Sequence, residues 1–442
     1  MGGNPLSIFK KMSVAPLKIA VIGSGVAGLT AAHYLNKKHS VHLIEKSERI
    51  GGHTRTLNLS EGKDAGLAVD TGFIVMNLRN YPHFNRLLKE LKVGIQKSCM
   101  TFSYTDTASG YGYAGTGLHG MLPQLSYLFN LSHYALIGDL IRFAFIGYKD
   151  LKSGFLKNLR LGDYLDERKF CPAFQNRYLF PMGAAIWSSP MLKMREFPAE
   201  PYLHFLDNHG LLRMINPPQW YTIKGGSQRY VQAILNRLKE APRICTEIDS
   251  IRRPEGSAAE IQFVSGAVES FDHIVIATHA DTALSLLGDA NESERGRLSP
   301  WTYQENEVIL HSDTDFMPTK KSHWASWNFM RRQGDGRSAA SAPVSVSYYM
   351  NRLQKLKTKT PYLVTLNPQK KINPDALINR TRMTHPLYSF AALESQKQLQ
   401  SENGKRNTWF CGSYFGYGFH EDAVRSSVEL VQALDPTIPI AP

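Results

Sequence analysis

The chain of 442 residues contains little cysteine and no C-x-x-C pair. Its four cysteines, Cys99, Cys171, Cys245 and Cys411, are scattered along the sequence. Such spacing argues against a disulfide scaffold, a zinc site and a covalent thiol centre, so we predict no metal site. Unpaired cysteines suit a reducing compartment. Residues 1–17 lack a sustained apolar core, so we expect no signal peptide and a cytoplasmic location.

Long hydrophobic runs are also missing. The richest stretch, residues 118–161, is interrupted by Asp139 and Arg142 before 18 apolar residues accumulate, which argues against a spanning helix. Basic residues follow at Lys149, Lys152, Lys157 and Arg160. This pattern fits a helix lying on a membrane surface. It fits an amphipathic helix packed inside a substrate domain equally well, and the sequence leaves both readings open.

Acidic residues are scarce relative to basic ones, giving a net charge of +13. Residues 317–382 alone carry 13 lysines and arginines against two aspartates, a net charge of +11. This segment is either a solvated surface or a contact with anionic phospholipid at the inner membrane. No nucleic-acid recognition module accompanies the charge, so we expect no nucleic-acid partner. The oligomeric state is not predicted.

The most informative segment that is present is residues 18–46. An apolar run, Ile19–Ile22, predicts a buried parallel strand, followed by a small-residue helix over Val26–Leu35 and a second strand over Val41–Ile44. Between strand and helix lies the pattern Gly23-x-Gly25-x-x-Gly28.

Each part of this pattern has a physical role in binding a dinucleotide. Gly23 permits a tight turn, Gly25 lets a pyrophosphate approach the backbone, and Gly28 lets the helix pack closely on the sheet. The pyrophosphate then lies at the helix N-terminus, where free N–H groups favour negative charge. Glu45 stands where an acid binds the adenosine ribose. The alternative is that these glycines only turn a strand into a helix.

The following residues resemble the flavin-dependent amine oxidase superfamily, which includes phytoene-type desaturases and protoporphyrinogen oxidase. The resemblance lies in Arg49, Gly51 and Gly52, with His53 where the family usually has a second arginine, and in Val69–Phe73. Towards the C-terminus, Trp409–Ser413 and Gly416–Ala423 resemble the superfamily's flavin motif, in which a helix N-terminus points at the flavin ring. The resemblance implies FAD as the cofactor.

The resemblance also implies the fold: an α/β protein with a Rossmann-like FAD-binding domain interleaved with a mixed α+β substrate domain. The FAD-binding pieces are predicted at 18–98, 221–300 and 401–436, after an N-terminal tail at 1–17. The substrate domain is predicted at 99–220 and 301–400. No second glycine pattern of this kind occurs, so we expect no NAD(P)H site, and electrons to leave to oxygen, a quinone or another acceptor.

Motif and resemblance together predict one set of FAD-binding residues. It comprises Gly23, Ser24, Gly25, Ala27, Gly28, Glu45, Lys46, Gly51, Gly52, His53, Thr54, Thr71, Gly72, Phe73, Ile248, Ala277, Gly412, Ser413, His420, Glu421, Asp422 and Ala423. No catalytic residue is predicted. Six further side chains are candidates for an apolar substrate pocket or for the core: Trp187, Trp324, Trp327, Tyr348, Tyr349 and His420.

Segments such as Pro181–Ser188 and Asn208–Leu212 resemble a bacterial subgroup of the superfamily linked with modified fatty acids. This resemblance implies an oxidoreductase that desaturates a hydrophobic substrate, a fatty acyl chain of a lipid, by hydride transfer to flavin. The region Glu305–Leu310 shows no lysine of the kind that amine oxidases place near the ring. An amine oxidase for a small amine or polyamine, and a non-catalytic flavoprotein partner of a lipid-modifying enzyme, remain the alternatives.

Overall fold

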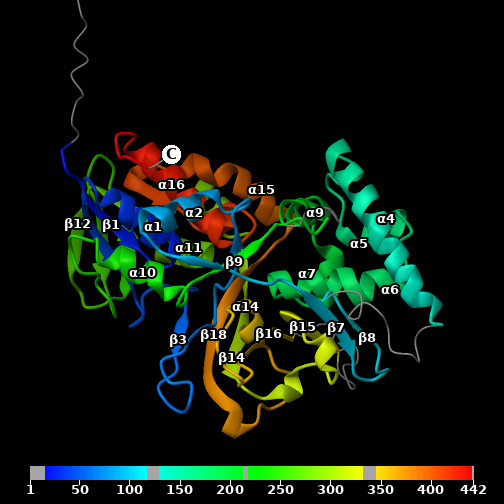
Figure 1. Ribbon diagram of the computed structural model, residues 1–442. Coiled ribbons are helices and arrows are strands. Elements are labelled where there is room, and N and C mark those ends of the chain that lie inside the picture. The colour runs from blue at the N-terminus through cyan, green and yellow to red at the C-terminus, as the bar shows by residue number, and fades with distance from the viewer. Residues whose placement is uncertain (1–14, 117–128, 213–217, 332–344, 441–442) are drawn as a thin grey trace, which may run out of the picture.

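The structure, a computed structural model, describes residues 15–116, 129–212, 218–331 and 345–440. One half of the molecule is built on a parallel sheet (Figure 1). Its strands, in spatial order, are β19 (Thr408–Phe410), β13 (His273–Ile276), β1 (Lys18–Ile22) and β2 (Ser40–Ile44). They come from three separate segments of the sequence. The apolar side chains of all four strands are buried, as expected of parallel strands covered on both faces.

Helix α1 (Val26–Leu35) follows β1 directly and is buried along its whole length. It packs against the C-terminal helix α16 (His420–Leu434), so the two ends of the sequence meet over the sheet (Figure 1). Helices α2 (Pro82–Glu90) and α10 (Gln228–Leu235) complete this layer. The predicted α/β fold class is confirmed.

An antiparallel meander leads back into the parallel sheet. Its strands are β10 (Ile248–Arg252), β11 (Ala259–Phe263) and β12 (Val268–Phe271). The residue pattern predicts the first of these strands from Ile244 to Ile251, and its predicted start is wrong. Cys245 has a φ of +50°, a left-handed conformation that ends extended structure, so pairing starts only at Ile248.

The other half of the molecule contains a mixed seven-stranded sheet. Its spatial order is β18 (Leu377–Leu387), β14 (Thr302–His311), β17 (Leu363–Leu366), β16 (Val346–Tyr349), β15 (Trp327–Arg331), β7 (Phe102–Asp106) and β8 (Gly112–Ala114). The residue pattern predicts strands at 307–311, 342–350 and 361–366, which overlap β14, β16 and β17, with residues 342–344 outside the described part. It did not predict β18, which pairs with β14 along nearly its whole length.

Helices cover one end of this second half (Figure 1). They are α4 (Leu131–Ser153), α5 (Leu161–Glu167), α6 (Pro172–Phe174), α7 (Phe180–Trp187), α8 (Met191–Glu196) and α9 (Ala199–Asn208). Small sheets, β3–β4 (Thr56–Asn58 and Ala68–Asp70) and β5–β9–β6 (Met76–Asn77, Trp220–Ile223 and Ile95–Lys97), join the halves. Of the predicted stretch 118–161, residues up to 128 lie outside the described part. In the part of the chain that the structure describes, no helix meets the length and hydrophobicity needed to cross a bilayer.

Candidate flavin and substrate site

A single cavity of about 1,360 Å³ runs between the two halves of the molecule. One end is lined by the glycine-rich segment after β1, and the other by the seven-stranded sheet and by α7 and α9. Ligand pockets commonly occupy about 300–1,000 Å³, so this space can hold more than one small molecule. It can therefore take a dinucleotide at one end and a substrate at the other.

The glycine-rich segment has the shape that a pyrophosphate requires. Gly23 has a φ of +95°, and a Cβ on Gly28 would come 1.9 Å from the Gly23 carbonyl oxygen. The backbone geometry of the turn therefore requires glycine at both positions. Gly25 differs, because its φ is −63° and a Cβ there would meet no atom within 4 Å. It caps α1 without any side-chain hydrogen bond and lines the cavity. The open space at Gly25 and the uncapped helix N-terminus fit a bound diphosphate.

The end of β2 lies beside this segment. Glu45 accepts hydrogen bonds from the backbone N–H and the hydroxyl of Ser24, at 2.9 and 2.6 Å. The Glu45 carboxylate thereby positions the turn between Gly23 and Gly25, and it also lines the cavity. Lys46, Ile248 and Ala277 line the same end, which gives the expected adenosine side both a cation and an apolar wall.

A second glycine pair continues the cavity wall. Gly51 and Gly52 both have positive φ, and a Cβ on Gly52 would come 3.0 Å from the Gly25 Cα. Arg49 donates to the carbonyl oxygens of Gly52 and Thr54, at 2.6 and 2.9 Å, and so holds this turn together. The turn is thus pressed directly against the first glycine segment.

The Asp-x-Gly segment is held by a different set of bonds. A Cβ on Gly72 would come 1.9 Å from the His53 carbonyl oxygen, so only glycine fits this crossing. The buried Asp70 carboxylate accepts hydrogen bonds from Thr56, Ser227 and Gln354. Asp70 therefore joins three distant segments and leaves the cavity wall to Thr71, Gly72 and Phe73.

The C-terminal motif presents only some of its predicted residues to the cavity. Gly412, Ser413, His420 and Ala423 line it. The Glu421 carboxylate instead accepts the backbone N–H groups of His83 and Phe84, at 2.9 and 3.0 Å, and caps α2. Asp422 accepts those of Tyr417 and Phe419 and caps its own helix. Neither carboxylate lines the cavity, and the predicted contact of Glu421 and Asp422 with the cofactor stays a prediction.

Most predicted residues do lie together. Those lining the cavity are Gly23, Ser24, Gly25, Ala27, Glu45, Lys46, Gly52, His53, Thr71, Gly72, Phe73, Ile248, Ala277, Gly412, Ser413, His420 and Ala423. Gly28, Gly51 and Thr54 stand behind this wall. Thr54 is buried and bonds to His420 Nε2 at 3.1 Å and to the hydroxyl of Tyr230, so it supports a lining residue.

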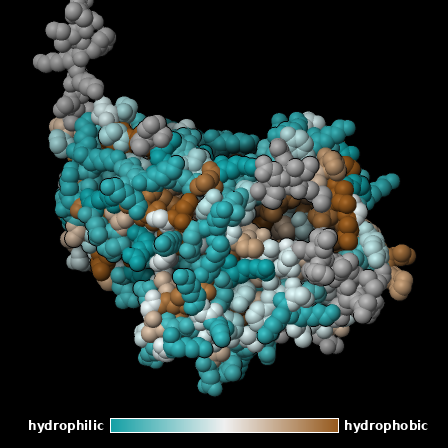
Figure 2. Space-filling view, viewed as in Figure 1, coloured by the Kyte–Doolittle hydropathy of each residue, from teal (hydrophilic) through white to brown (hydrophobic). Residues whose placement is uncertain are grey.

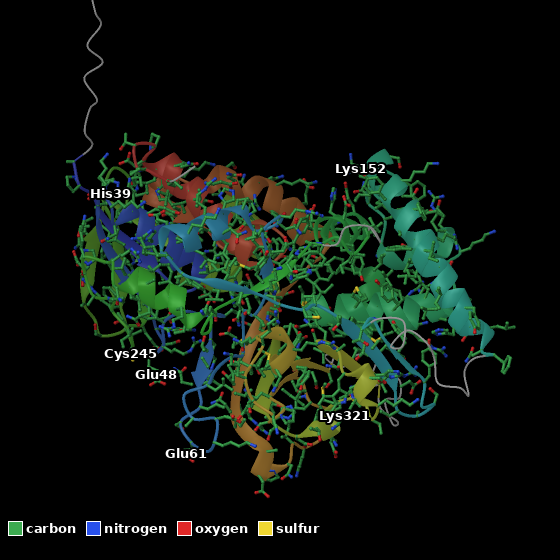
Figure 3. The ribbon with its side chains drawn as sticks, viewed as in Figure 1. His39, Glu48, Glu61, Lys152, Cys245 and Lys321 are labelled. Atoms are coloured by element: carbon green, nitrogen blue, oxygen red, sulfur yellow. The ribbon has the colours of Figure 1, made fainter. Side chains whose placement is uncertain are left out.

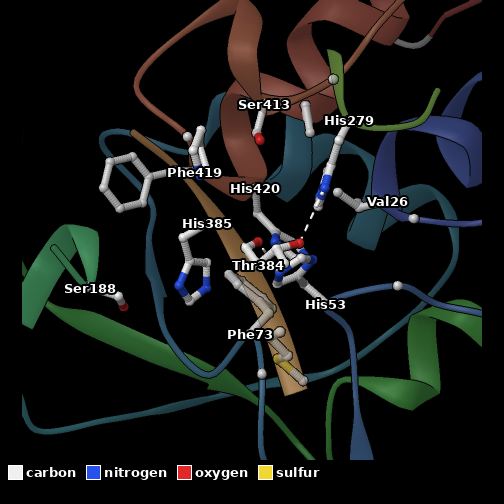
Figure 4. A pocket seen from close by; sticks show the side chains of 18 of the residues that line it. Val26, His53, Phe73, Ser188, His279, Thr384, His385, Ser413, Phe419 and His420 are labelled. Carbon is white, nitrogen blue, oxygen red and sulfur yellow. Dashed lines mark hydrogen bonds between the residues drawn. The ribbon is translucent and has the colours of Figure 1, made fainter. Parts of the chain in front are cut away.

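Four histidines line the middle of the cavity, and Figure 4 shows them around Thr384. His53 Nε2 donates to the Thr384 carbonyl oxygen at 2.9 Å, and the Thr384 hydroxyl lies 3.3 Å from His279 Nδ1. His420 stacks on Phe73 with ring centroids 3.7 Å apart. Burial lowers the pKa of His279, His385 and His420 to about 3. These imidazoles are therefore neutral near pH 7.

His385 was not predicted as a site residue, because β18 was not recognised as a strand. Its Nδ1 lies 3.1 Å from the side-chain nitrogen of Asn306. The same nitrogen donates to the Gln304 carbonyl oxygen at 3.0 Å, while the Asn306 side-chain oxygen accepts from Asn367 at 2.8 Å. This pattern fixes the amide orientation, so Nδ1 of His385 must accept. The proton of the neutral ring is consequently on Nε2.

The register of the sheet shows where His385 points. Side chains alternate between the two faces of a strand, and paired residues share a face. Val308 pairs with Thr381, and Asn306 with Met383, so His385 lies on the same face as Val308 and Met383. In Figure 4 the His385 ring lies at the edge of the group formed by His53, His420 and Thr384, on the side towards Ser188, and its centroid is 5.3 Å from that of His53. The His385 ring thus lines the cavity where the histidine group meets this face of the sheet.

This face of the sheet forms an apolar chamber. The chamber residues on the strands are Phe102, Val308, Trp327, Tyr348, Val364, Leu366 and Met383. Ile74, Met100, Met182, Ile186, Phe205 and Trp220 complete its walls. Among the aromatic candidates, Trp327, Tyr348 and His420 line the cavity, whereas Trp187 packs in the core and Trp324 packs on Tyr349.

The chamber is also poor in acids. The carboxylates among the described lining residues are Glu45, Glu247, Asp281 and Glu305. The first two belong to the adenosine side. Glu305 alternates with Asn306, points to the opposite face of β14 and pairs with Arg382 at 3.4 Å. None of these four lining carboxylates thus comes from the sheet face that floors the chamber.

The fold and the continuous glycine-lined cavity define a dinucleotide-binding protein with a separate substrate chamber. Residues 26–434 match the family described as "Flavin containing amine oxidoreductase". The chain therefore belongs to this family, which confirms the predicted superfamily, the FAD cofactor and a flavin-dependent oxidoreductase.

Individual relatives are more distant. The chain is 48% identical to the flavin-dependent L-tryptophan oxidase RebO of Lentzea aerocolonigenes over 52 residues, 12% of this chain and only 11% of that relative. The fold resembles a CLA-producing fatty acid isomerase from P. acnes, with a TM-score of 0.67, 16% identity and 95% and 99% of the two chains covered. It also resembles cyclohexylamine oxidase from Brevibacterium oxydans, with a TM-score of 0.65, 15% identity and 95% and 100% covered.

Proposed function

We propose that this protein oxidises the acyl chain of a fatty acid or lipid, removing a hydride and a proton from neighbouring carbons to leave a double bond. The observation that carries this proposal is the apolar chamber on the seven-stranded sheet, with walls of aliphatic, aromatic and methionine side chains. An acyl chain gains free energy by leaving water for such a surface, at roughly 0.8 kcal/mol for each buried CH₂.

His385 supports an acyl substrate in a second way. Its Nε2–H, fixed by Asn306, is a hydrogen-bond donor beside the chamber. A donor matches a carboxylate or ester carbonyl oxygen. It does not match an ammonium group, which offers only donors of its own.

Different residues of the site would bind the cofactor, orient the substrate and exclude water in such a reaction. When bound, FAD accepts the hydride from the substrate C–H bond. Gly25 and the N-terminus of α1 would hold the diphosphate, and Phe73, Ser413 and His420 would border the ring end. The chamber walls orient the chain and exclude water, while His385 fixes its polar end. Hydride transfer of this kind depends on positioning. The proton from the neighbouring carbon would pass to a neutral imidazole that lines the cavity, such as His279 or His420.

Amine oxidation is the competing function. The names of RebO and of cyclohexylamine oxidase favour it, since both act on nitrogen-bearing substrates. A carboxylate facing the chamber would favour a cationic amine as the substrate. Glu305, the acid of β14 that lines the cavity, points to the other face of the sheet. The name of the fatty acid isomerase, which has a similar fold, favours an acyl substrate.

A comparison of cellular lipids tests the proposal. Mass spectrometry of total lipids, with and without the protein, should reveal acyl species that differ by two hydrogens. An unchanged lipid profile, together with a changed amine profile, would favour the alternative.

A further inference from the structure

Helix α4 has an inverted distribution of polarity. Its two carboxylates, Asp139 and Asp150, are both buried, where Asp139 accepts from Arg142 and the Cys171 backbone and Asp150 pairs with Arg168. The exposed side from residue 131 to 145 is formed by Leu131, Tyr134, Ala135, Gly138, Ile141 and Phe145. These residues recur every three or four positions and so form one stripe along the helix.

The stripe consists of large side chains that are well exposed. Leu131 is 83% exposed, Phe145 73%, and Phe129, just before the helix, 92%. Figure 2 shows hydrophobic side chains gathered in this part of the surface. Single exposed apolar residues are ordinary, but a row of them on one helix face marks an interaction surface.

Positive charge follows the stripe. The exposed residues after Phe145 include Lys149, Lys152 and Lys157. Figure 3 shows Lys152 at the end of α4, with Lys321 of the strongly basic segment 317–382 at the opposite end of this half of the molecule. The charge beside α4 is therefore separate from that segment. An apolar stripe with flanking lysines matches the surface of an anionic bilayer, where acyl chains lie beneath negatively charged headgroups.

The cavity reaches the surface close to this helix. Leu211 lines the cavity and is 41% exposed, so it lies at an opening. The next residue, Leu212, is buried against α4, where a Cβ on Gly147 would come 3.1 Å from its Cδ1. The opening at Leu211 thus adjoins the element that carries the stripe.

We propose that α4 docks the protein on an anionic lipid bilayer, with Leu131, Ile141 and Phe145 inserted among the acyl chains and the following lysines at the headgroups. Because Leu212 packs on the inward face of α4, docking holds the opening at Leu211 on the side of the helix turned away from the bilayer, about one helix diameter from it. The purpose of this arrangement rests on the proposed acyl substrate, but the docking itself does not.

Sedimentation of the FAD-loaded protein with vesicles tests the proposal. Vesicles of phosphatidylcholine mixed with phosphatidylglycerol should bind the protein, and phosphatidylcholine alone should bind it less. The double variant Ile141→Ser, Phe145→Ser should bind at least about tenfold more weakly, because burying a large apolar side chain changes a binding constant by that order. Both residues are exposed, so flavin content should not change.

Two triple variants separate the candidate surfaces. Lys149, Lys152 and Lys157 changed to Gln should weaken binding to anionic vesicles, whereas the matched change of Lys355, Lys357 and Lys359 should leave it nearly unaltered. The proposal is overturned if the wild type ignores both kinds of vesicle, if the serine variant binds as tightly as the wild type, or if only the second triple variant loses binding. A serine variant that instead shifts the oligomeric state in light scattering would assign the stripe to a protein interface. Because no turnover is measured, these outcomes do not depend on the proposed reaction.

Discussion

The side-chain amide of Asn306 donates a hydrogen bond to Nδ1 of His385, across a distance of 3.1 Å. Asn306 is itself fully buried and held by Asn367, whose side-chain oxygen accepts the backbone N–H of Glu307. A chain of bonds thus runs from the backbone of β14 to the ring on β18. It determines which ring nitrogen carries the proton beside the substrate chamber.

Replacing Asn306 by Asp should reverse this tautomer. An aspartate oxygen accepts where the amide donated, so the proton moves to Nδ1 and a lone pair faces the chamber. Titration of flavin absorbance with a long-chain fatty acid should show binding weaker by about tenfold or more, the usual effect of leaving a polar group unmatched. A long-chain alcohol, whose hydroxyl both donates and accepts, is the control and should bind nearly as before. Equal losses for acid and alcohol would mean that the variant has only disturbed the chamber.

Gly25 and Gly28 should respond differently to an added side chain. Gly25→Val places its Cβ in the open cavity, so we expect a folded protein without FAD. Gly28→Ala drives its Cβ against the Gly23 backbone, so we expect loss of folded protein. Circular dichroism and flavin absorbance of the purified variants measure the two effects. Normal FAD binding by Gly25→Val would show that this segment is not part of the FAD site.

Stability should fall as the solution becomes acidic. His279, His385 and His420 have a folded pKa of about 3, below the ordinary value of 6.5, so the unfolded chain binds protons first. Their stabilising contribution is complete above about pH 6.5 and is lost progressively as the pH falls towards the folded pKa. The midpoint of thermal unfolding should therefore drop between about pH 7 and pH 5. His279→Gln should flatten this slope, and an unchanged slope would show that His279 is not buried as a neutral ring.

The sequence predicted the dinucleotide half of the protein well because its signals are local. The helix predicted over Val26–Leu35 has those bounds in the structure, since strand, glycines and helix follow one another without interruption. Gly51, Gly52 and Gly72 were identified from the resemblance to the flavin-dependent family. Their backbone angles and close crossings leave no room for other residues.

The substrate half was less predictable because its geometry depends on pairing between distant segments. His385 becomes recognisable as a site residue only when β18 pairs with β14 and Asn306 lies beside it. Similarly, the composition of residues 118–161 could not tell which face of a helix is buried. In the structure Asp139 is turned inward and Phe145 outward, the reverse of the usual order.

Anaerobic mixing of the FAD-loaded protein with candidate substrates tests the central claim most directly. Reduction of flavin bleaches its visible absorbance, so the class of substrate can be read without knowing the natural electron acceptor. We predict that fatty acids or acyl lipids bleach the flavin and that simple amines, polyamines and tryptophan do not. Rapid bleaching by an amine, with none by any acyl substrate, would contradict the account.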